Sequence, residues 1–260
     1  SISPFFDKVW LTSKETEPMF KKWGCNTIFQ PYAANPFIYN DRFSHHITRL
    51  AFIGTPYGTR SVLINNLLNG DIPCDVYFKR VSHHQQINSL PMSLRLRNIS
   101  RMTRFSIGRR LLLSKIAASF INTKLNQDSD CYQAKNSLSF EEMNVAYSNY
   151  ALSLNITDLL TTGALKHPIQ KLHLRTFEIP MCAGLELVAD NDELKDYFSE
   201  DEMVFYSNKD DMIDKARFYI RPSNAILCRN MKRNARKRAE REHCWKRRFD
   251  VVFDSLNIKA

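Results

Sequence analysis

The sequence predicts an α/β fold built on a doubly wound parallel sheet. Strand-like and helical segments alternate along most of the 260 residues, and repeated βα units of this kind form parallel sheets with helices on both faces. The run "ITRLAFIG" (47–54) is almost continuously apolar, as strands buried in such sheets are. Hydrophobic residues make up 43% of the chain, which is enough for a sizeable core.

Each element has its own signal in the chain. Gly70 is a typical C-terminal stop for a helix, and Ser139 with Glu142 has the spacing of a capping box at a helix start. Pro36 follows a small-residue turn that we interpret as the end of a linker. The predicted strands cover residues 8–12, 47–54, 74–80, 151–156, 185–189 and 203–207. The predicted helices cover residues 14–23, 59–70, 139–150, 171–182, 192–198 and 208–220.

Two segments interrupt this alternation, and both are basic. We interpret residues 89–127 as an insertion of one or two amphipathic helices, and the chain from Ser223 onward as one or two long helices. The net charge is +10, of which residues 95–115 carry +7 and residues 226–248 carry +8, so the remainder is about −5. The positive charge therefore belongs to these two segments and not to the domain as a whole.

Basic helices of this kind have three open interpretations. They can bind nucleic-acid phosphates, bind anionic lipid headgroups, or present a solvated face without a ligand. Residues 89–127 interleave Leu, Ile, Phe and Met with Arg, which favours a membrane surface over duplex DNA. The C-terminal segment has fewer apolar residues between its charges and fits a solvated helix face.

Neither the cysteines nor the apolar segments indicate a metal site or a membrane span. The six cysteines are scattered without a CxxC pair, so we expect no metal, and reduced thiols in a cytoplasmic protein. No apolar run is long enough to span a bilayer, and no signal peptide starts the chain. Because the sequence opens at Ser1 without a methionine, we expect a fragment or a processed chain.

The first candidate binding motif is the turn "FIGTPYGTR" (52–60). A strand that ends at Gly54 and leads into a helix brings free backbone N–H groups toward a ligand, and a helix N-terminus favours phosphate. Arg60 could then contact a diphosphate, because guanidinium groups bind phosphate well. The pattern is neither GxGxxG nor a P-loop, so on pattern alone an ordinary strand-to-helix turn is preferred.

The second candidate motif is "LHLRTFEIPMCAG" (172–184). Arg175 and Glu178 are three residues apart and share a helix face, so a simple surface ion pair is one interpretation. The other is a ligand site, because Glu178 lies in an apolar run and a carboxylate there needs a hydrogen-bonding partner. Ribose hydroxyls offer two adjacent donors and would suit an ionised carboxylate.

Taken in order, these segments resemble the retaining GT-B glycosyltransferases, in particular the CgeB-like spore-maturation group with its "glycosyl transferases group 1" C-terminal domain. The resemblance covers most of the chain except residues 81–130 and 223–242. The stretches that carry it include "RLAFIGTPYGTRSVLINNLL", "LSFEEMNVAYSNYALSLNI", "LRTFEIPMCAGLELVADNDELKDYF" and "HCWKRRFDVVFDSL".

In the GT-B family two Rossmann-like domains face each other, and the C-terminal one binds the nucleotide-sugar donor. The resemblance therefore implies a truncated N-terminal domain and a complete donor-binding domain in this chain. It implies donor contacts for eight residues: Glu178 with the ribose, Arg60 and Arg175 with the diphosphate, and Gly54, Thr55, Asn155, Ala183 and Gly184 along the ligand edge.

The chain departs from the family at two points. Gln170 stands where the wider family has a second glutamate, eight positions before Glu178. Only the last βαβ of the acceptor-side domain is present, so we interpret residues 1–40 as the remnant of that domain with its linker. Residues 41–222 are then the nucleotide-sugar-binding domain with its helical insertion, and residues 223–260 are the C-terminal basic helices.

Two functions are compatible with this sequence. The first is the donor-binding half of a metal-independent glycosyltransferase without a cofactor, which uses a nucleotide-sugar and an unknown glycan, lipid or protein acceptor. Residues 89–127 would then give a cytoplasmic protein a peripheral membrane contact, with nucleic acid the less favoured partner. The alternative is a non-catalytic module on the same scaffold that binds nucleic acid or anionic lipid through its basic segments.

Overall fold

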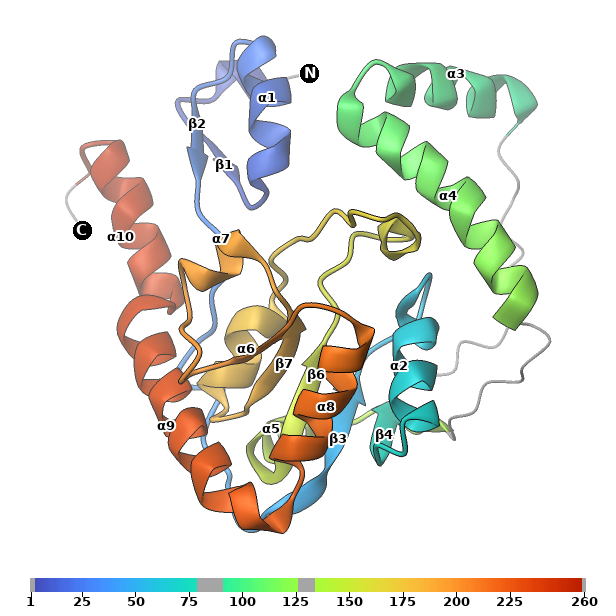
Figure 1. Cartoon of the computed structure of the whole chain (residues 1–260). Coiled ribbons are helices and arrows are strands. Elements are labelled where there is room, and N and C mark those ends of the chain that lie inside the picture. Colours follow the sequence, from blue (N-terminus) through green and yellow to red (C-terminus); the bar gives the residue numbers. More distant parts are fainter. Residues whose placement is uncertain (1–2, 79–90, 126–133, 259–260) are drawn as a thin grey trace. The chain divides into compact units, whose positions relative to one another are not determined.

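The computed structural model describes residues 3–78, 91–125 and 134–258 and has an α/β architecture (Figure 1). The strands are β1 (Val9–Leu11), β2 (Thr27–Phe29), β3 (Ile47–Ile53), β4 (Cys74–Tyr77), β5 (Ala134–Lys135), β6 (Tyr150–Asn155), β7 (Glu186–Ala189) and β8 (Val204–Tyr206). The helices are α1 (Glu17–Lys22), α2 (Arg60–Asn69), α3 (Met92–Thr103), α4 (Ser106–Leu125), α5 (Phe140–Asn149), α6 (Arg175–Met181), α7 (Asp192–Lys195), α8 (Lys209–Tyr219), α9 (Ala225–Glu242) and α10 (Trp245–Ser255).

Six of the strands form one sheet in the order β5-β4-β3-β6-β7-β8, and β1 and β2 form a separate pair. The β3–β6, β4–β5, β6–β7 and β7–β8 pairs are parallel, as is β1–β2. Helices flank the large sheet, so the predicted fold class is confirmed (Figure 1).

The chain divides into two compact units. Unit 1 comprises residues 1–51, 139–157 and 171–260, and unit 2 comprises residues 52–138 and 158–170. Unit 1 therefore holds the β1–β2 pair, the strands β6 to β8 and the helices α1 and α5 to α10. Unit 2 holds α2, β4, α3, α4 and β5, and β3 contributes residues to both units.

The core of unit 1 gathers around Phe177 of α6. Its ring lies 5.9 Å from the ring of Tyr197, 6.2 Å from that of Phe198 and 5.6 Å from that of His243 at the end of α9. All six residues of β6 are buried, which explains the apolar runs in the central strands. The C-terminal helix α9 thus packs on the helix that carries Glu178.

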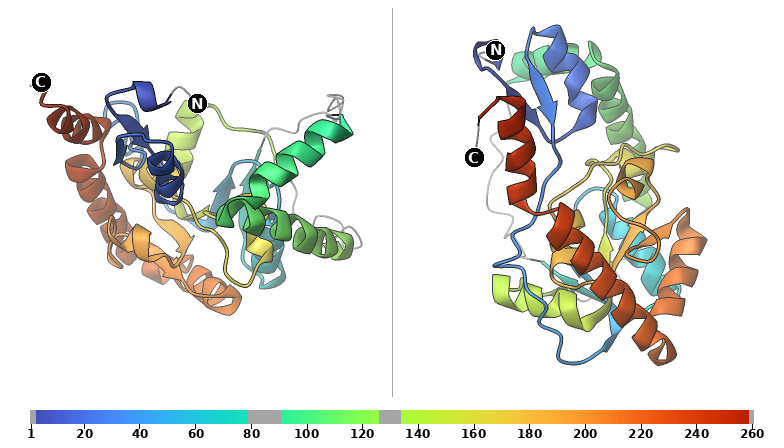
Figure 2. Two further views of the ribbon diagram at one scale, coloured as in Figure 1. Left: turned by 90° about the horizontal axis from the view of Figure 1, so that it is seen from above. Right: turned by 90° about the vertical axis from the view of Figure 1, so that its left-hand side faces the viewer.

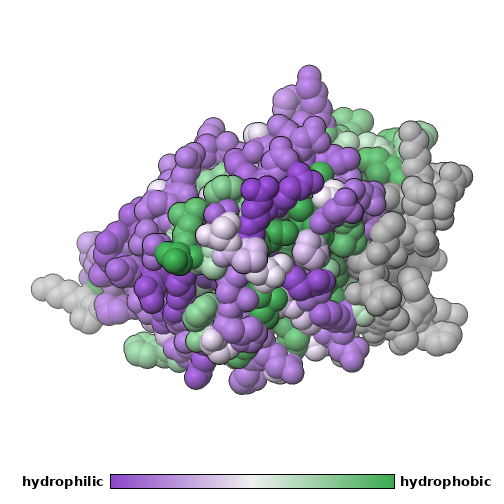
Figure 3. Space-filling model, turned by 60° about the horizontal axis from the view of Figure 1, so that its bottom comes forward, coloured by the Kyte–Doolittle hydropathy of each residue, from purple (hydrophilic) through white to green (hydrophobic). Residues whose placement is uncertain are grey.

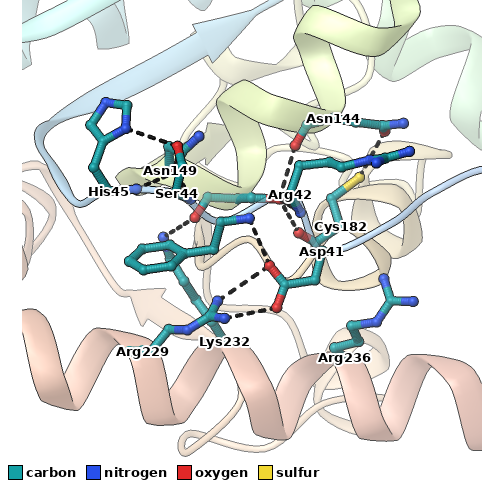
Figure 4. A network of polar contacts seen from close by, with 12 residues as sticks. Asp41, Arg42, Ser44, His45, Asn144, Asn149, Cys182, Arg229, Lys232 and Arg236 are labelled. Carbon is teal, nitrogen blue, oxygen red and sulfur yellow. Dashed lines mark hydrogen bonds and ion pairs between the residues drawn. The ribbon is translucent and has the colours of Figure 1, made fainter.

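A polar network fixes the linker that precedes β3 (Figure 4). The backbone N–H of Arg42 donates to Ser148 Oγ at 2.9 Å, and the N–H of Ser44 donates to Asn149 Oδ1 at 2.9 Å, both at the end of α5. On the α9 side, Arg229 forms an ion pair with Asp41 at 2.8 Å. The linker is therefore held by helices that lie far from it in the sequence.

The first strand and the last helix of unit 1 are in contact. Trp10 of β1 lies with its ring 6.3 Å from that of Trp245 and 5.4 Å from that of Phe249, both on α10. The ribbon of α10 lies beside the β1–β2 pair in Figure 2. The Trp10 indole N–H also donates to the carbonyl of Gln30 at 2.8 Å, just after β2. These contacts tie α10 to the β1–β2 pair.

In unit 2, the long helix α4 packs on the loop that contains the short 3-10 turn Thr162–Ala164. Ser114 and Thr161 share a hydroxyl hydrogen bond of 2.8 Å, and Arg110 donates to the carbonyl of His167 at 2.5 Å. Gly58 lies against the same loop, because a Cβ at this position would approach the Leu160 carbonyl oxygen to 2.7 Å.

Several predicted elements agree with the structure, and some boundaries differ. The Ser139–Glu142 capping box is confirmed by both of its hydrogen bonds, of 2.7 Å and 3.2 Å. The helix predicted over 171–182 is α6 and starts later, at Arg175, because the Lys171 N–H donates to the Thr157 carbonyl instead. Residues 79–80, 89–90, 126–127 and Cys131 of the sequence predictions lie outside the described residues.

Candidate functional site

The site residues of unit 1 gather on and beside α6. Glu178 is half-buried, and its Oε1 accepts a 2.5 Å hydrogen bond from the hydroxyl of Tyr39. The Tyr39 ring meets that of Phe140 edge-on at 5.1 Å, at the first residue of α5. Burial and the hydrogen bond to Glu178 raise the pKa of Tyr39, so Tyr39 stays the donor and Glu178 the acceptor. Oε2 of Glu178 bonds to no described residue.

Arg175 begins α6, one turn before Glu178, where both belong to a single helix face. In the part of the chain that the structure describes, the two side chains form no ion pair, so a surface Arg–Glu pair does not explain them. The guanidinium instead lies near Tyr147 and Glu186. Burial raises the pKa of each of these two groups, and Arg175 lowers both.

Asn155 closes β6 and is directed into the core of unit 1. Its Nδ2 donates to Glu186 Oε1 at 2.7 Å and to Thr176 Oγ1 at 3.2 Å. Glu186 is fully buried, and its Oε2 has no hydrogen-bond partner among the described residues. Burial raises the pKa of Glu186 to about 8, although the Asn155 bond and Arg175 lower it, so burial favours the protonated form of this carboxyl.

The Ala183–Gly184 turn reverses the chain from α6 into β7. Ala183 has a φ of 52°, the left-handed conformation that often ends a helix. A Cβ on Gly184 would lie 2.8 Å from the Ile179 side chain and 3.0 Å from the Tyr147 carbonyl oxygen, so only glycine fits. Ala183 itself is fully buried, and the turn is therefore packed into unit 1.

The remaining predicted residues lie in unit 2, at the turn from β3 into α2. Gly54 has a φ of 148°, and its N–H donates to the Tyr77 carbonyl at 2.8 Å. The buried Arg60 at the start of α2 donates to the Thr55 carbonyl at 3.3 Å and lies 4.0 Å over the Tyr57 ring. The guanidinium therefore folds back over its own turn.

A carboxyl group that the sequence reasoning missed lies beside Arg60. Burial raises the pKa of Asp158 to about 6, and Arg60 lowers it. A Cβ on Gly163 would collide with Asp158 Oδ2 and Thr59 Oγ1, so the 158–163 loop lies directly on the start of α2. Gln170, which stands in place of the family glutamate, forms an antiparallel bridge with Asp158.

The structure thus groups the predicted residues by unit. Arg175, Glu178, Asn155, Ala183 and Gly184 surround α6 in unit 1, and Gly54, Thr55 and Arg60 share one turn in unit 2. The sequence reasoning missed Tyr39, Glu186 and Asp158. A signal for Glu186 was present, because it is the one acid inside the apolar strand "LELVA".

The described residues contain neither a metal-binding cluster nor a membrane-spanning helix. Among residues 3–78, 91–125 and 134–258, no group of three or more His, Cys, Asp or Glu side chains could hold a metal ion. Within the same ranges, no helix combines the length and the apolar character needed to cross a bilayer.

Comparison with known proteins places this architecture among the GT-B glycosyltransferases. The sequence profile of the glycosyl transferase-like family matches residues 109–254, more than half of the chain. The chain belongs to this glycosyl transferase-like family. No curated protein matches the sequence. The family is broader than the CgeB-like group, and membership of that group stays a prediction.

Solved structures of glycosyltransferases share the fold. Sucrose-phosphate synthase from Thermosynechococcus elongatus has a TM-score of 0.56 and 12% identity over 98% of this chain and 59% of that one. HepE from Anabaena, solved with UDP-glucose, has a TM-score of 0.59 and 9% identity over 98% and 65%. TarM from S. aureus has a TM-score of 0.60 and 10% identity over 98% and 44%. The chain spans less than two thirds of the length of each of these proteins.

Proposed function

We propose that this chain is the donor-binding half of a glycosyltransferase that transfers a sugar from a nucleotide-sugar. The observation that carries the proposal is Glu178, a half-buried carboxylate on α6 with one oxygen held by Tyr39 and the other unbonded by described residues. Two adjacent ribose hydroxyls are donors that such a carboxylate can accept. Membership of a glycosyl transferase-like family and a fold shared with HepE, which was solved with UDP-glucose and with UDP, support this assignment.

Two arginines supply positive charge in this proposal. Arg175 begins α6, and its guanidinium favours an anionic donor group. The family resemblance gives Arg60 the same class of ligand. Positive groups fixed before the reaction stabilise the charge that develops on a departing diphosphate, and we propose that they do so without a metal ion. The acceptor is a glycan, a lipid or a protein.

The cysteines support a reducing compartment, and we propose a cytoplasmic location. Five cysteines, Cys25, Cys74, Cys182, Cys228 and Cys244, are buried and free of disulfides. Burial together with the nearby Glu178 carboxylate raises the pKa of the Cys182 thiol, so it is kept as an inert thiol beside the site.

The test is binding of UDP-, GDP- and CMP-linked sugars to the whole chain by calorimetry. We expect one class of donor to bind, and Glu178→Gln to weaken it by about tenfold or more, since a hydrogen bond to a charged group contributes roughly 1.5–3 kcal/mol. The matched control is Glu141→Gln, which changes an exposed carboxylate on α5 and leaves binding unaltered. A folded chain that binds no donor, or a Glu178→Gln variant with the affinity of the wild type, would contradict the proposal.

The second candidate function is a non-catalytic module that binds a polyanion. It is favoured by the basic helices α3 and α4, which contain no acidic residue. Binding of RNA or anionic lipid that falls steeply with salt, together with no donor binding in the same calorimetric titration, would select this function.

A further inference from the structure

The orientation of α4 is set by one buried face. Ser114 and Ala118, four residues apart, are buried, and the Ser114 hydroxyl bonds to that of Thr161 at 2.8 Å. Arg110 adds a bond to the His167 carbonyl at 2.5 Å. These contacts hold α4 against unit 2 by this face, so the opposite face points away from the unit.

The opposite face of α4 is apolar and exposed. Leu113, Ile116 and Phe120 follow the i, i+3, i+7 spacing of one helix face and are 59%, 59% and 70% exposed. On α3, a second row at i, i+4, i+7 consists of Met92, Leu96 and Ile99, which are 70%, 60% and 44% exposed. We call these six side chains the apolar rows of α3 and α4.

Exposed apolar side chains are ordinary when they stand alone. On the face shown in Figure 3, hydrophobic residues lie in small groups among hydrophilic ones. The apolar rows differ because each repeats with the period of its helix over about two turns, in residues 92–99 of α3 and 113–120 of α4. Rows of this kind mark a surface that interacts with something apolar.

The charge of the same two helices has one sign only. Residues 91–125 contain no Asp or Glu. Six exposed cations of these helices form no ion pair with a described residue. They are Arg97, Arg101, Arg104, Arg109, Arg110 and Lys115. The only bonds described for these six run to carbonyl groups, from Arg109 to Thr103 and from Arg110 to His167. Their charge is therefore uncompensated within the described chain.

We propose that the outer surface of α3 and α4 docks on a bilayer that contains anionic phospholipids. The headgroups supply the negative charge that the cations lack, and the acyl boundary takes up the apolar rows. A nucleic acid would pair with the cations and leave the apolar rows in water. Because neither helix is long and apolar enough to cross the bilayer, both helices lie along its surface.

This proposal goes beyond the donor-binding function and is tested separately from it. The full chain is sedimented with vesicles of phosphatidylcholine alone or mixed with phosphatidylserine. We expect binding to the mixed vesicles that weakens as salt increases, and little binding to phosphatidylcholine alone. Replacing Leu113, Ile116 and Phe120 together by Ser lowers the partition coefficient by about tenfold or more, because the apolar area that enters the bilayer is lost.

The control is a matched triple variant on other helices. Phe218, Ile226 and Leu227 are exposed apolar residues of α8 and α9, and their replacement by Ser leaves vesicle binding unchanged. Circular dichroism and donor calorimetry show whether each variant is folded. As a second variant, Arg101→Gln with Arg104→Gln keeps the apolar rows and reduces binding to the mixed vesicles.

Three results would overturn the proposal. The first is a folded wild-type chain that stays in solution with the mixed vesicles. The second is vesicle binding that the α4 triple variant does not change. The third is self-association or RNA binding that requires Leu113, Ile116 and Phe120, in the absence of vesicle binding, because the surface would then belong to that other partner.

Discussion

The two basic segments look alike in the sequence and differ in the structure. Residues 95–115 and 226–248 carry +7 and +8. On α9, three cations form ion pairs with acids: Arg229 pairs with Asp41 at 2.8 Å, Arg236 with Glu240 at 2.6 Å, and Arg238 with Glu242 at 2.9 Å. On the described part of α3 and α4, no cation has an acidic partner. Residues 226–248 therefore use their positive charge in contacts within the protein. In residues 95–115 a similar charge is available to bind a partner.

The most deeply buried of these stabilising contacts are made by Lys232 (Figure 4). This lysine is fully buried, and its Nζ donates to the carbonyls of Ser148 at 2.9 Å and Tyr150 at 2.6 Å, where α5 ends and β6 begins. Arg236 likewise donates to the carbonyls of Tyr39 and Met181. The number of cations in a segment therefore says little about their role, because the groups that face each cation decide it.

We expect the largest effect on stability from the loss of the buried Lys232 contacts. Lys232→Ala removes two buried hydrogen bonds and leaves carbonyl groups without a donor, so we expect the free energy of unfolding to fall by about 4 kcal/mol. Chemical denaturation measures the change. The control Lys237→Ala, at an exposed position of the same helix, changes it by less than about 0.5 kcal/mol. Equal losses for the two variants would show that α9 is not braced through Lys232.

The burial of Lys232 also makes the stability of the protein depend on pH. Burial, with Arg229 adding to it, lowers the pKa of Lys232 from 10.5 to about 8. Between these two values the folded state releases the proton first, so stability rises with pH across this window, by about 3 kcal/mol at most. The difference in unfolding free energy between the wild type and Lys232→Met, measured from pH 8 to pH 10.5, isolates this contribution. A constant difference across the window would contradict it.

We expect the smallest effect on stability from substitutions on α3. Arg101→Glu combined with Arg104→Glu alters two exposed cations that have no described ion pair, and we expect the unfolding free energy to stay within about 0.5 kcal/mol of the wild type. The comparison variant is Arg236→Glu on α9, which loses its bonds to two carbonyls and to Glu240 and is clearly destabilised. A clear loss of stability on α3 would mean that its cations also brace the fold.

The pattern of apolar residues in the sequence was sufficient to predict the architecture. The apolar runs predicted β3, β6, β7 and β8 within one or two residues, because a strand buried on both faces leaves a continuous apolar signal. The two-residue strand β5 leaves no such signal. The start of α6 was placed too early, because only the fold brings the Lys171 N–H to the Thr157 carbonyl.

Less of the candidate site than of the fold could be predicted from the sequence. Arg175 and Glu178 could be found because their spacing is local. Tyr39 lies 139 positions from Glu178, and Asn155 lies 31 positions from Glu186, so these pairs exist only in the folded chain. In the same way, the sequence predicted basic amphipathic helices in 89–127, but only the Ser114–Thr161 contact shows which face of α4 points outward.

The contact between Trp10 and Trp245 determines what fluorescence can report. The chain has three tryptophans, which are Trp10 on β1, Trp23 after α1 and Trp245 on α10. None lies on the six-stranded sheet. Tryptophan emission therefore follows the release of α10 from the β1–β2 pair and does not report directly on the six-stranded sheet. Far-ultraviolet circular dichroism follows the remaining structure, and a fluorescence midpoint below the circular-dichroism midpoint would show that α10 separates before the sheet melts.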